Sequence, residues 1–405
     1  DAAGGSIAYD VANLENLTVN DIAYTKANNT YWNSTEKVLY AYDAISLSSS
    51  QITGLSGLSA SDNLTIRGSE SSEAASGTDS LNLNIDRSSE LTGNLTINLG
   101  GDNDTLNSAK LKNGDSIDMG AGDDAVYLML TGSNGTPTIS AANLTNLDGG
   151  AGNDTLGFEE SGSNTSELTL TTAGATNFEN LIGTAGAETL KGDANANILQ
   201  GKGGADTLYG YAGNDTLHAD TASGDGRTDN DNLYGGAGND TLRGNYGDNT
   251  LDGGTGADTI TTQLGSDTIV LRSGDGGSTI SAADTITDFT DGSDILGMDS
   301  LSFSDLTIEQ GPGDYSNHTL VKITSSGEYL LVIQNVSASN VTVFDFSSMA
   351  TDALTLNGTS GNDGLVGGAG NDTFNGGAGN DTLLGFSGDD TFNIRSKSGA
   401  YTDTV

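Results

Sequence analysis

Aspartates that follow glycine-rich turns at a fixed spacing are the residues of this 405-residue chain best suited to chemistry. The octet GGAGNDTL at 235–242 contains one such turn, and closely related octets stand at 149–156, 367–374 and 376–383. Carboxylate and main-chain carbonyl oxygens are what a hard cation requires, and Ca²⁺ takes about six to eight of them. A turn that aims carbonyls inward beside an aspartate can therefore build a calcium site.

The turns recur every nine residues. Repeats start at 183, 192, 201 and 210, a seven-residue insertion at 219–225 and a degenerate repeat at 226–234 follow, and the array resumes at 235, 244, 253 and 262. A second block starts at Gly358. Glycine at the first, second and fourth positions permits backbone conformations that a β-carbon would block. The sixth position carries the aspartate, and the eighth an apolar residue of a short strand that points into the core.

The repeat has the form GGxGxDxUx, in which U is a large apolar residue, and it resembles the nonapeptide of the RTX (haemolysin-type calcium-binding) family of secreted bacterial proteins. The resemblance implies an all-β fold built as a parallel β-roll or β-solenoid, with several Ca²⁺ ions as cofactors between stacked turns. The expected metal ligands come from the turn glycines and the sixth-position aspartates. They are Gly150, Gly152, Asp154, Asp206, Gly213, Asp215, Asp231, Gly236, Gly238, Asp240, Gly254, Gly256, Asp258, Asp267, Gly361, Asp363, Gly368, Gly370, Asp372, Gly377, Gly379, Asp381, Gly388 and Asp390.

Two nonapeptides make one coil of a β-roll, so repeats i and i+2 are expected to stack on the same side. The uncharged Asn197 and Asn249 and the longer Glu188 predict weak or absent sites where they replace the aspartate. The insertion at 219–225 lies between Asp215 and Asp240. It therefore predicts that the pair Asp240 and Asp258 forms a less perturbed site than the pair Asp215 and Asp240. The expected sides are Glu188, Asp206, Asp231, Asn249 and Asp267 on one, and Asn197, Asp215, Asp240 and Asp258 on the other.

Strand and turn patterns divide the chain into five predicted segments. They are a β-rich segment at 1–61, a β-solenoid with long coils and isolated RTX-like turns at 62–182, an RTX β-roll at 183–283, a small antiparallel β unit at 284–356, and a second β-roll at 357–405 that looks incomplete at its C-terminal end. The antiparallel unit interrupts the roll. The segment that begins Asp284-Thr285-Ile286 resembles the one that closes a repeat block in serralysin-type proteases, and Thr402 to Val405 looks like the opening of another.

Composition excludes several classes of partner. Acidic residues number 55 against 14 basic ones, so the net charge is 14 − 55 = −41. Such a charge argues against nucleic acid and anionic membranes, which need Lys/Arg patches. There is no cysteine, hence no disulfide or thiolate metal site, and no run reaches transmembrane length. A halophile-like solvated surface is the alternative explanation of the acidity, but the carboxylates here keep a fixed repeat position.

Two alternatives bear on the metal sites. The turns could belong to an ion-free solenoid, an explanation strongest for the isolated turns at 100–106 and 120–126, where Asp102 replaces the fourth-position glycine of the first. In the repeat blocks the apolar stripe is too thin to order the chain by itself, and the carboxylates repel one another. We therefore expect the blocks to be disordered without calcium and to fold at millimolar calcium.

No catalytic constellation is visible. The two histidines, His218 and His318, stand outside any HExxH motif, and GxSxG is missing. An acidic pair could hide among so many carboxylates, but nothing singles one out, and we expect no enzyme. The texture is similar to that of RTX-bearing surface-layer proteins, which implies a secreted or cell-surface structural protein that self-associates. The alternatives are the calcium-folded part of a large adhesin, and the secretion module of an enzyme whose catalytic domain lies outside these residues. A start at Asp1 rather than Met suggests a processed chain or an excerpt.

Overall fold

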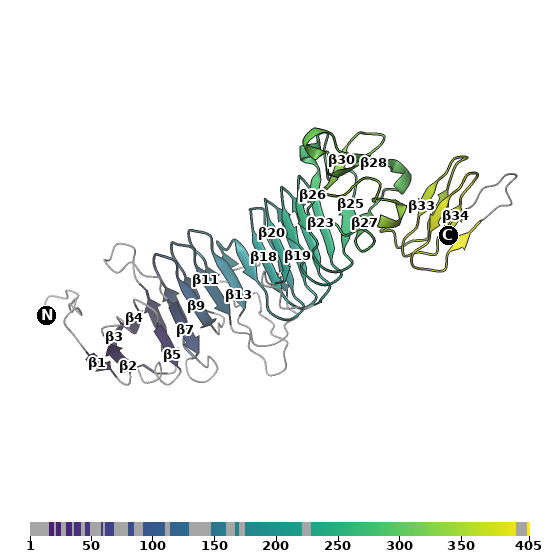
Figure 1. Cartoon of the computed structure of the whole chain (residues 1–405). Helices are drawn as coiled ribbons and strands as arrows, with labels where there is room; N and C mark the ends of the chain where they lie inside the picture. The colour runs from purple at the N-terminus through teal and green to yellow at the C-terminus, as the bar shows by residue number, and fades with distance from the viewer. Residues whose placement is uncertain are drawn as a thin grey trace. The chain divides into compact units, whose positions relative to one another are not determined.

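The protein is described by a computed structural model in which β-strands predominate (Figure 1). No α-helix occurs among the residues that the structure describes, and none of their segments is a helix long and apolar enough to cross a membrane. The chain divides into two compact units, 1–185 and 186–405. The described residues are 16–19, 22–25, 30–34, 36–41, 45–48, 58–59, 61–68, 80–84, 92–109, 114–128, 147–158, 167–169, 175–220, 228–393 and 403–405.

In the first unit, strands that alternate along the chain build two largely parallel sheets. One sheet starts with an antiparallel pair and continues in parallel, in the order β3 (Thr30–Asn33), β4 (Val38–Ala41), β6 (Leu64–Arg67), β8 (Leu95–Asn98), β10 (Ser116–Asp118), β12 (Leu147–Asp148) and β15 (Ala175–Thr176). The other contains β5 (Ile45–Ser48), β7 (Ser80–Asn84), β9 (Thr105–Ala109), β11 (Ala125–Leu128), β13 (Thr155–Phe158) and β16 (Asn180–Ile182). The remaining strands are an antiparallel hairpin, β1 (Asn16–Val19) and β2 (Ile22–Thr25), and β14 (Glu167–Thr169).

The second unit contains the first predicted roll, again as two parallel sheets of alternating strands. One sheet is formed by β17 (Thr189–Lys191), β19 (Thr207–Ala212), β21 (Asn232–Ala237), β23 (Thr250–Thr255), β25 (Thr268–Leu271), β27 (Ile295–Met298) and β31 (Phe346–Ser348). The other runs through β18 (Ile198–Lys202), β20 (Thr216–Asp220), β22 (Thr241–Arg243), β24 (Thr259–Thr261) and β26 (Asp284–Ile286).

The eighth-position side chains form two apolar columns inside this roll. Leu190 pairs with Leu208, which is 18 residues and hence two nonapeptides further along, as predicted for one coil. All members of both columns are fully buried. The first column is Leu190, Leu208, Leu233, Leu251 and Ile269, and the second is Leu199, Leu217, Leu242, Ile260 and Ile286.

Within the predicted antiparallel segment 284–356, antiparallel pairing of strands covers a smaller part than predicted. There, only β28 (Leu306–Gln310), β29 (Thr319–Ile323) and β30 (Tyr329–Ile333) pair in this way among the described residues. The flanking strands β26, β27 and β31 extend the two parallel sheets of the roll. Short 3₁₀ turns connect these strands: η3 (Ile280–Ala282), η4 (Phe303–Asp305), η5 (Gly313–Tyr315) and η6 (Val343–Asp345).

The second predicted roll follows directly. It has two small parallel sheets, one of β32 (Thr355–Asn357), β34 (Thr373–Asn375) and β36 (Thr391–Phe392), the other of β33 (Gly364–Val366) and β35 (Thr382–Leu384). Phe374 and Leu383 are buried in its core, with the ring of Phe392 stacked on Phe374 at 4.8 Å between centroids. The fold is therefore the predicted all-β parallel roll with a short antiparallel interruption.

Glycine is required in the turns because coils approach one another closely. Gly235 faces the carboxylate of Asp240 in its own repeat, and a β-carbon there would overlap Oδ2. Gly236 and Gly238 have φ of 111° and 139°, in the region that favours glycine. A β-carbon on Gly238 would in addition overlap the carbonyl oxygen of Gly213, one coil away. The fourth-position glycine therefore permits both the turn and the stacking.

The second position keeps its left-handed conformation even where it is not glycine. Positive φ is found at Lys202 (78°), Tyr211 (75°), Asn245 (66°), Gln263 (71°) and Phe386 (61°). For a residue with a β-carbon, that conformation costs roughly 1–2 kcal/mol of conformational free energy. Stacking on neighbouring coils therefore imposes the turn, and glycine only lowers its cost.

Replacing Gly238 with alanine should destabilise the calcium-loaded protein by more than the roughly 1–3 kcal/mol of an unfavourable backbone conformation, because the new methyl group would overlap the Gly213 carbonyl. Gly327→Ala is the matched control. Its φ is 74° and a β-carbon there meets nothing within 4 Å, so only about 1–2 kcal/mol should be lost. Thermal unfolding followed by circular dichroism measures both, and equal losses would contradict the steric argument.

Candidate metal sites

The sixth-position aspartates form hydrogen-bonded columns that run from coil to coil. The N–H of Asp215 donates to Oδ1 of Asp240 at 2.7 Å, and the N–H of Asp240 donates to Oδ1 of Asp258 at 2.7 Å. The column continues to Asp284, whose Oδ1 accepts from the N–H of Asp258 at 2.9 Å. Asn197 starts it, donating to Asp215.

A second column occupies the other side of the same roll, so the two predicted sides are confirmed. It ends on Asp294, whose Oδ1 accepts from the N–H of Asp267 at 3.2 Å. Sequence reasoning did not include Asp284 or Asp294 among the site residues, although each stands two residues before an apolar side chain, as in the repeat. The members in order are Glu188, Asp206, Asp231, Asn249, Asp267 and Asp294.

The insertion at 219–225 leaves the column undisturbed. Asp215 and Asp240 are 25 residues apart, yet their hydrogen bond has the same length as that between Asp240 and Asp258, 18 apart. The expected difference between these two positions is therefore absent from the column. Of the insertion, 221–225 lie outside the described residues.

The turns predicted to be isolated in the first unit also stack. Gly101, Ala121 and Ala151 are bridged in parallel, and Asp154 donates its N–H to Oε2 of Glu179 at 2.7 Å. The predicted Gly150 and Gly152 have φ of 105° and 152°. This column contains Asp104, Asp124, Asp154 and Glu179.

The second roll repeats the arrangement on two sides. Asp363 donates to Asp381, and Asp381 to Asp403, each at 3.1 Å. Asp372 donates to Asp390 at 2.8 Å, and the N–H of Leu354 donates to Asp372 in turn. Asp403 therefore takes the position in this roll that Asp284 takes in the first. Of the predicted site glycines here, Gly377, Gly379 and Gly388 have positive φ.

Gly361, Gly368 and Gly370 do not have the left-handed conformation on which their prediction was based. Gly368 and Gly370 still need to be small, because a β-carbon would overlap the carbonyl oxygens of Ala350 and Asp352 respectively. Gly361 has no such constraint, since a β-carbon would come no closer than 3.7 Å to Thr359 Oγ1.

In the second roll, Oδ2 of Asp363 and Asp372 accepts a main-chain N–H, from Thr359 and Gly368 respectively. Elsewhere the second carboxylate oxygen of the column aspartates shows what they could bind. In Asp206, Asp215, Asp231, Asp240 and Asp267, Oδ2 is buried and has no hydrogen-bond partner among the described residues. The same holds for Asp124 and Asp154 in the first unit. A buried charged oxygen without a donor is costly unless a cation or a proton meets it. The donor set therefore fits a bound cation.

Asn249 shows what surrounds that oxygen. Its Nδ2 donates to the carbonyl oxygens of Gly244, Tyr246 and Gly247, the first, third and fourth positions of its repeat, at 3.1, 3.3 and 3.2 Å. Nδ2 faces the first-position glycine, as Oδ2 of Asp240 does in its own repeat. Where aspartate stands, a carboxylate oxygen thus faces carbonyl oxygens, and all of them attract a hard cation. At Asn249 the side-chain amide already donates to these carbonyl oxygens. This agrees with the prediction of a weak or absent metal site there.

No three carboxylate or imidazole side chains converge on one point within the described part of the chain. Each candidate site offers instead a carboxylate from a turn, its stacked neighbour, and main-chain carbonyls. Oxygen ligands of this mixed kind suit Ca²⁺. A search for clusters of acidic side chains would miss such sites, because the backbone supplies most of the oxygens.

Burial raises the pKa of these aspartates above their ordinary value of 3.8. The pKa rises to about 9 for Asp206, to about 7 for Asp231 and Asp267, and to about 6 for Asp215. Neighbouring carboxylates in the columns add to the effect of burial. In the absence of a cation, the fold therefore favours protonated carboxyls.

Fifth-position side chains form a further ladder that sequence reasoning missed. The N–H of Asn239 donates to Oδ1 of Asn214 at 2.8 Å, and Ala257 donates to Oδ1 of Asn239 at 3.0 Å. Asn362 and Asn380 are linked in the same way in the second roll. The sequence does contain the pattern, as the Asn-Asp pair at the fifth and sixth positions of the repeat. The asparagine links the turns of neighbouring coils, and the aspartate makes other contacts.

A guanidinium group neutralises carboxylates near the end of the first roll. Arg272 binds Asp252 through two hydrogen bonds of 2.9 and 2.6 Å, and it also contacts Asp299 at 3.2 Å and Asp275 at 3.5 Å. The main-chain oxygen of Asp275 accepts from the N–H of Gly256, a turn residue. A side-chain cation thus stands beside a turn of the roll.

One comparison with known proteins, the match to a repeat family, agrees with this geometry. The chain matches the RTX calcium-binding nonapeptide repeat (4 copies) at 146–156, 182–221, 225–260, 243–276 and 355–393, and repeats of this family bind multiple calcium ions and are typical of secreted proteins. No protein of curated function matches it significantly in sequence. Among solved structures it is similar to the solution structure of the AlgE6R3 subunit from the Azotobacter vinelandii mannuronan C5-epimerase, with 22% identity over 53% of this chain and 84% of that chain. The TM-score of 0.18 is too low for that likeness to carry an argument.

Exchanging aspartate and asparagine in the columns should separate folding from metal binding. Asp240→Asn keeps the oxygen that accepts from Asp215 and supplies an amide to the turn carbonyls, as Asn249 does. The variant should gain β-structure in chelator but lose calcium stabilisation, by about 2.7 kcal/mol per lost site at 100 times Kd. Asn249→Asp is the matched reverse change and should do the opposite. Calcium titrations followed by circular dichroism measure both, and parallel shifts in the two variants would contradict the assignment.

Acid should partly replace calcium in the folding of this chain. Burial raises the folded pKa of Asp215, Asp231 and Asp206 to about 6, 7 and 9 against an ordinary 3.8. The calcium-free folded state therefore holds more protons than the unfolded state, and its stability falls as pH rises through those values. In chelator, β-structure should be greater at about pH 5 than at about pH 8. Circular dichroism at the two pH values measures this, and the reverse order would contradict it.

Proposed function

We propose that this RTX-repeat protein is an extracellular structural protein, which folds when its stacked turns bind calcium and then self-associates into a surface layer, filament or matrix. The observation that supports this is the set of carboxylate columns. They run through each roll. In the first roll they leave buried oxygens, such as Oδ2 of Asp215 and Asp240, that have no hydrogen-bond donor among the described residues and need a proton or a cation. The rolls are therefore scaffolds whose order depends on the calcium concentration outside the cell.

The predicted site residues are the proposed ligands of these ions. Each ion lies between turns of neighbouring coils and takes Oδ2 of a sixth-position aspartate together with carbonyl oxygens such as those that surround Asn249. The turn glycines contribute through their main chain and by permitting close stacking. Because the sites exist only in the folded roll, every bound ion adds to the free energy of unfolding.

Self-association is expected to need the same ions. A chain with a net charge of −41 repels its own copies until cations neutralise it. Large apolar side chains then offer contact points, since Leu264 is 62% exposed, Phe344 57% and Phe386 50%. Calcium would thus act twice, first on the fold and then on contacts between copies.

The two histidines support a role without catalysis. His218 lies in parallel register with Gln200 and Arg243 on neighbouring strands, and burial lowers its pKa. His318 accepts the N–H of Asn335 through Nδ1 at 3.0 Å. Both positions suit structural contacts, and we assign the chain no enzymatic activity.

Calcium at millimolar levels should produce ordered sheets or filaments in electron micrographs, and chelator should disperse them. Magnesium at the same concentration is the control, because its stricter octahedral geometry suits these turns poorly. The double variant Leu264→Ser and Phe386→Asn should fold in calcium but assemble less, since both side chains are exposed. Monomers of folded protein in calcium, seen by sedimentation, would contradict the structural role and favour a ligand-binding one.

A further inference from the structure

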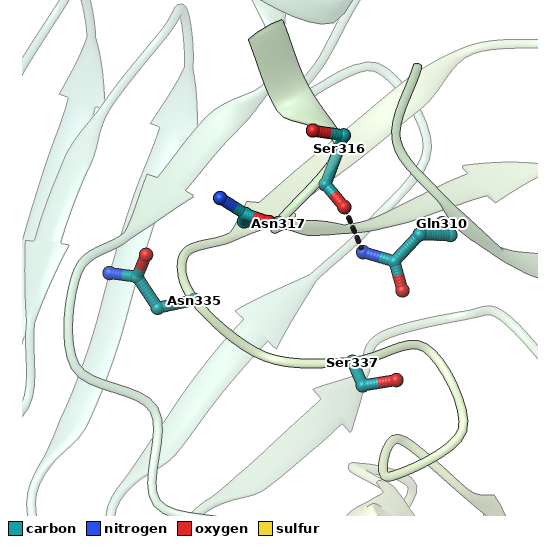
Figure 2. Close-up of a pocket in the computed structure, with 5 residues that line it drawn as sticks. All are labelled: Gln310, Ser316, Asn317, Asn335 and Ser337. Atoms are coloured by element: carbon teal, nitrogen blue, oxygen red, sulfur yellow. Dashed lines mark hydrogen bonds between the residues drawn. The ribbon is translucent and has the colours of Figure 1, made fainter. Parts of the chain in front are cut away.

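A polar recess opens in the antiparallel part of the second unit and shares no residue with the carboxylate columns. It has a volume of about 450 Å³ and is lined by Gln310, Ser316, Asn317, Asn335 and Ser337 (Figure 2). Gln310 ends β28, the serine and asparagine at 316–317 precede β29, and the other two follow β30. Three connected strands therefore contribute to one hollow.

The walls of the recess are held in place by Gln310. Its Nε2 donates to the carbonyl oxygens of Ser316 and His318 at 3.1 and 2.8 Å, and its Oε1 accepts from the N–H of Ala338 at 3.0 Å. The N–H of Asn335 donates to His318 Nδ1. These bonds tie the loop before β29 to the loop after β30, so the recess is formed before any ligand arrives.

The remaining side chains are available to a ligand. Ser316, Asn317 and Asn335 are exposed, and their side chains make no hydrogen bond within the described range 228–393. Figure 2 shows the two asparagines on one side of the recess, opposite Gln310. Two carboxamides and a hydroxyl offer both donors and acceptors, on loops whose main chain is held by Gln310. The Tyr315 ring lies edge-on to His318, 6.2 Å away, beside the same loop.

The chemistry of the lining restricts the ligand. No ionisable side chain lines the recess, so a charged ligand would find no counter-ion, and the net charge of −41 repels anions. Sites for apolar ligands are lined mainly by apolar side chains, which is not the case here. A volume of about 450 Å³ falls within the roughly 300–1,000 Å³ usual for small-molecule sites. We infer that the recess binds a neutral saccharide unit, whose hydroxyls pair with the amides of Asn317 and Asn335 and the hydroxyl of Ser316.

The test uses the full chain folded in calcium, titrated with glucose, galactose, mannose and N-acetylglucosamine and followed by calorimetry or NMR. At least one sugar should bind saturably, in about the millimolar range expected for a few hydrogen bonds in an open site. Asn317→Ala should weaken that binding about tenfold or more. Asn335→Gly is a second variant, suited to the φ of 59° at this position, and it should have a similar effect.

Asn340→Ala is the matched control, an exposed asparagine that follows the same loop but does not line the recess. It should bind sugar like the unmodified chain. Circular dichroism in calcium confirms that each variant is folded. No saturable binding of any of the four sugars to the folded chain would overturn the inference, and so would equal binding by all variants. Binding of a neutral polar peptide in place of every sugar would also overturn it.

Discussion

Repulsion between stacked carboxylates is the constraint on which this structure depends. In column aspartates of the first roll such as Asp215 and Asp240, one oxygen accepts a hydrogen bond from the neighbouring coil, and the other is buried without a donor among the described residues. That second oxygen must meet a proton, an amide or a cation. At Asn249 an amide replaces the carboxylate and donates to the carbonyl oxygens of its turn. Near the end of the first roll, the guanidinium of Arg272 binds the carboxylate of Asp252. Calcium is the solution that the remaining positions need.

The column also explains why the repeat tolerates some changes and not others. A turn is defined by the close approach of the next coil, so glycine is required where carbonyl oxygens stand behind it, as at Gly238. At the second position other residues are tolerated with a strained backbone, as at Tyr211. The insertion between Asp215 and Asp240 is tolerated in the column, since the hydrogen bond between these residues has the same length as the one between Asp240 and Asp258. Spacing in the sequence can vary as long as the stacked atoms keep their places.

The segment 284–356 extends the first roll with parallel strands and adds an antiparallel part with a different chemistry. β26, β27 and β31 continue the parallel sheets of the first roll, and the N–H of Ser348 donates to the carbonyl oxygen of Gly367 in the second. The same part of the chain carries a recess lined only by neutral polar groups. The protein thus combines calcium-binding rolls with a recess that is lined only by uncharged side chains.

The sequence by itself determined the repeat, the parallel roll, the two sides of the first roll and the aspartates that line them. It could do so because a strict period of nine repeats the same turn and the same buried residue, so local pattern and global stacking agree. Only the tertiary structure decided that the turns before 126 stack on Asp154, that Asp284 and Asp294 end the columns, and that Gly361 is unconstrained. Those features depend on which coil lies next to which across 20 to 30 residues of irregular sequence. The recess around Gln310 was likewise invisible, because it arises where loops from three strands meet and follows no period.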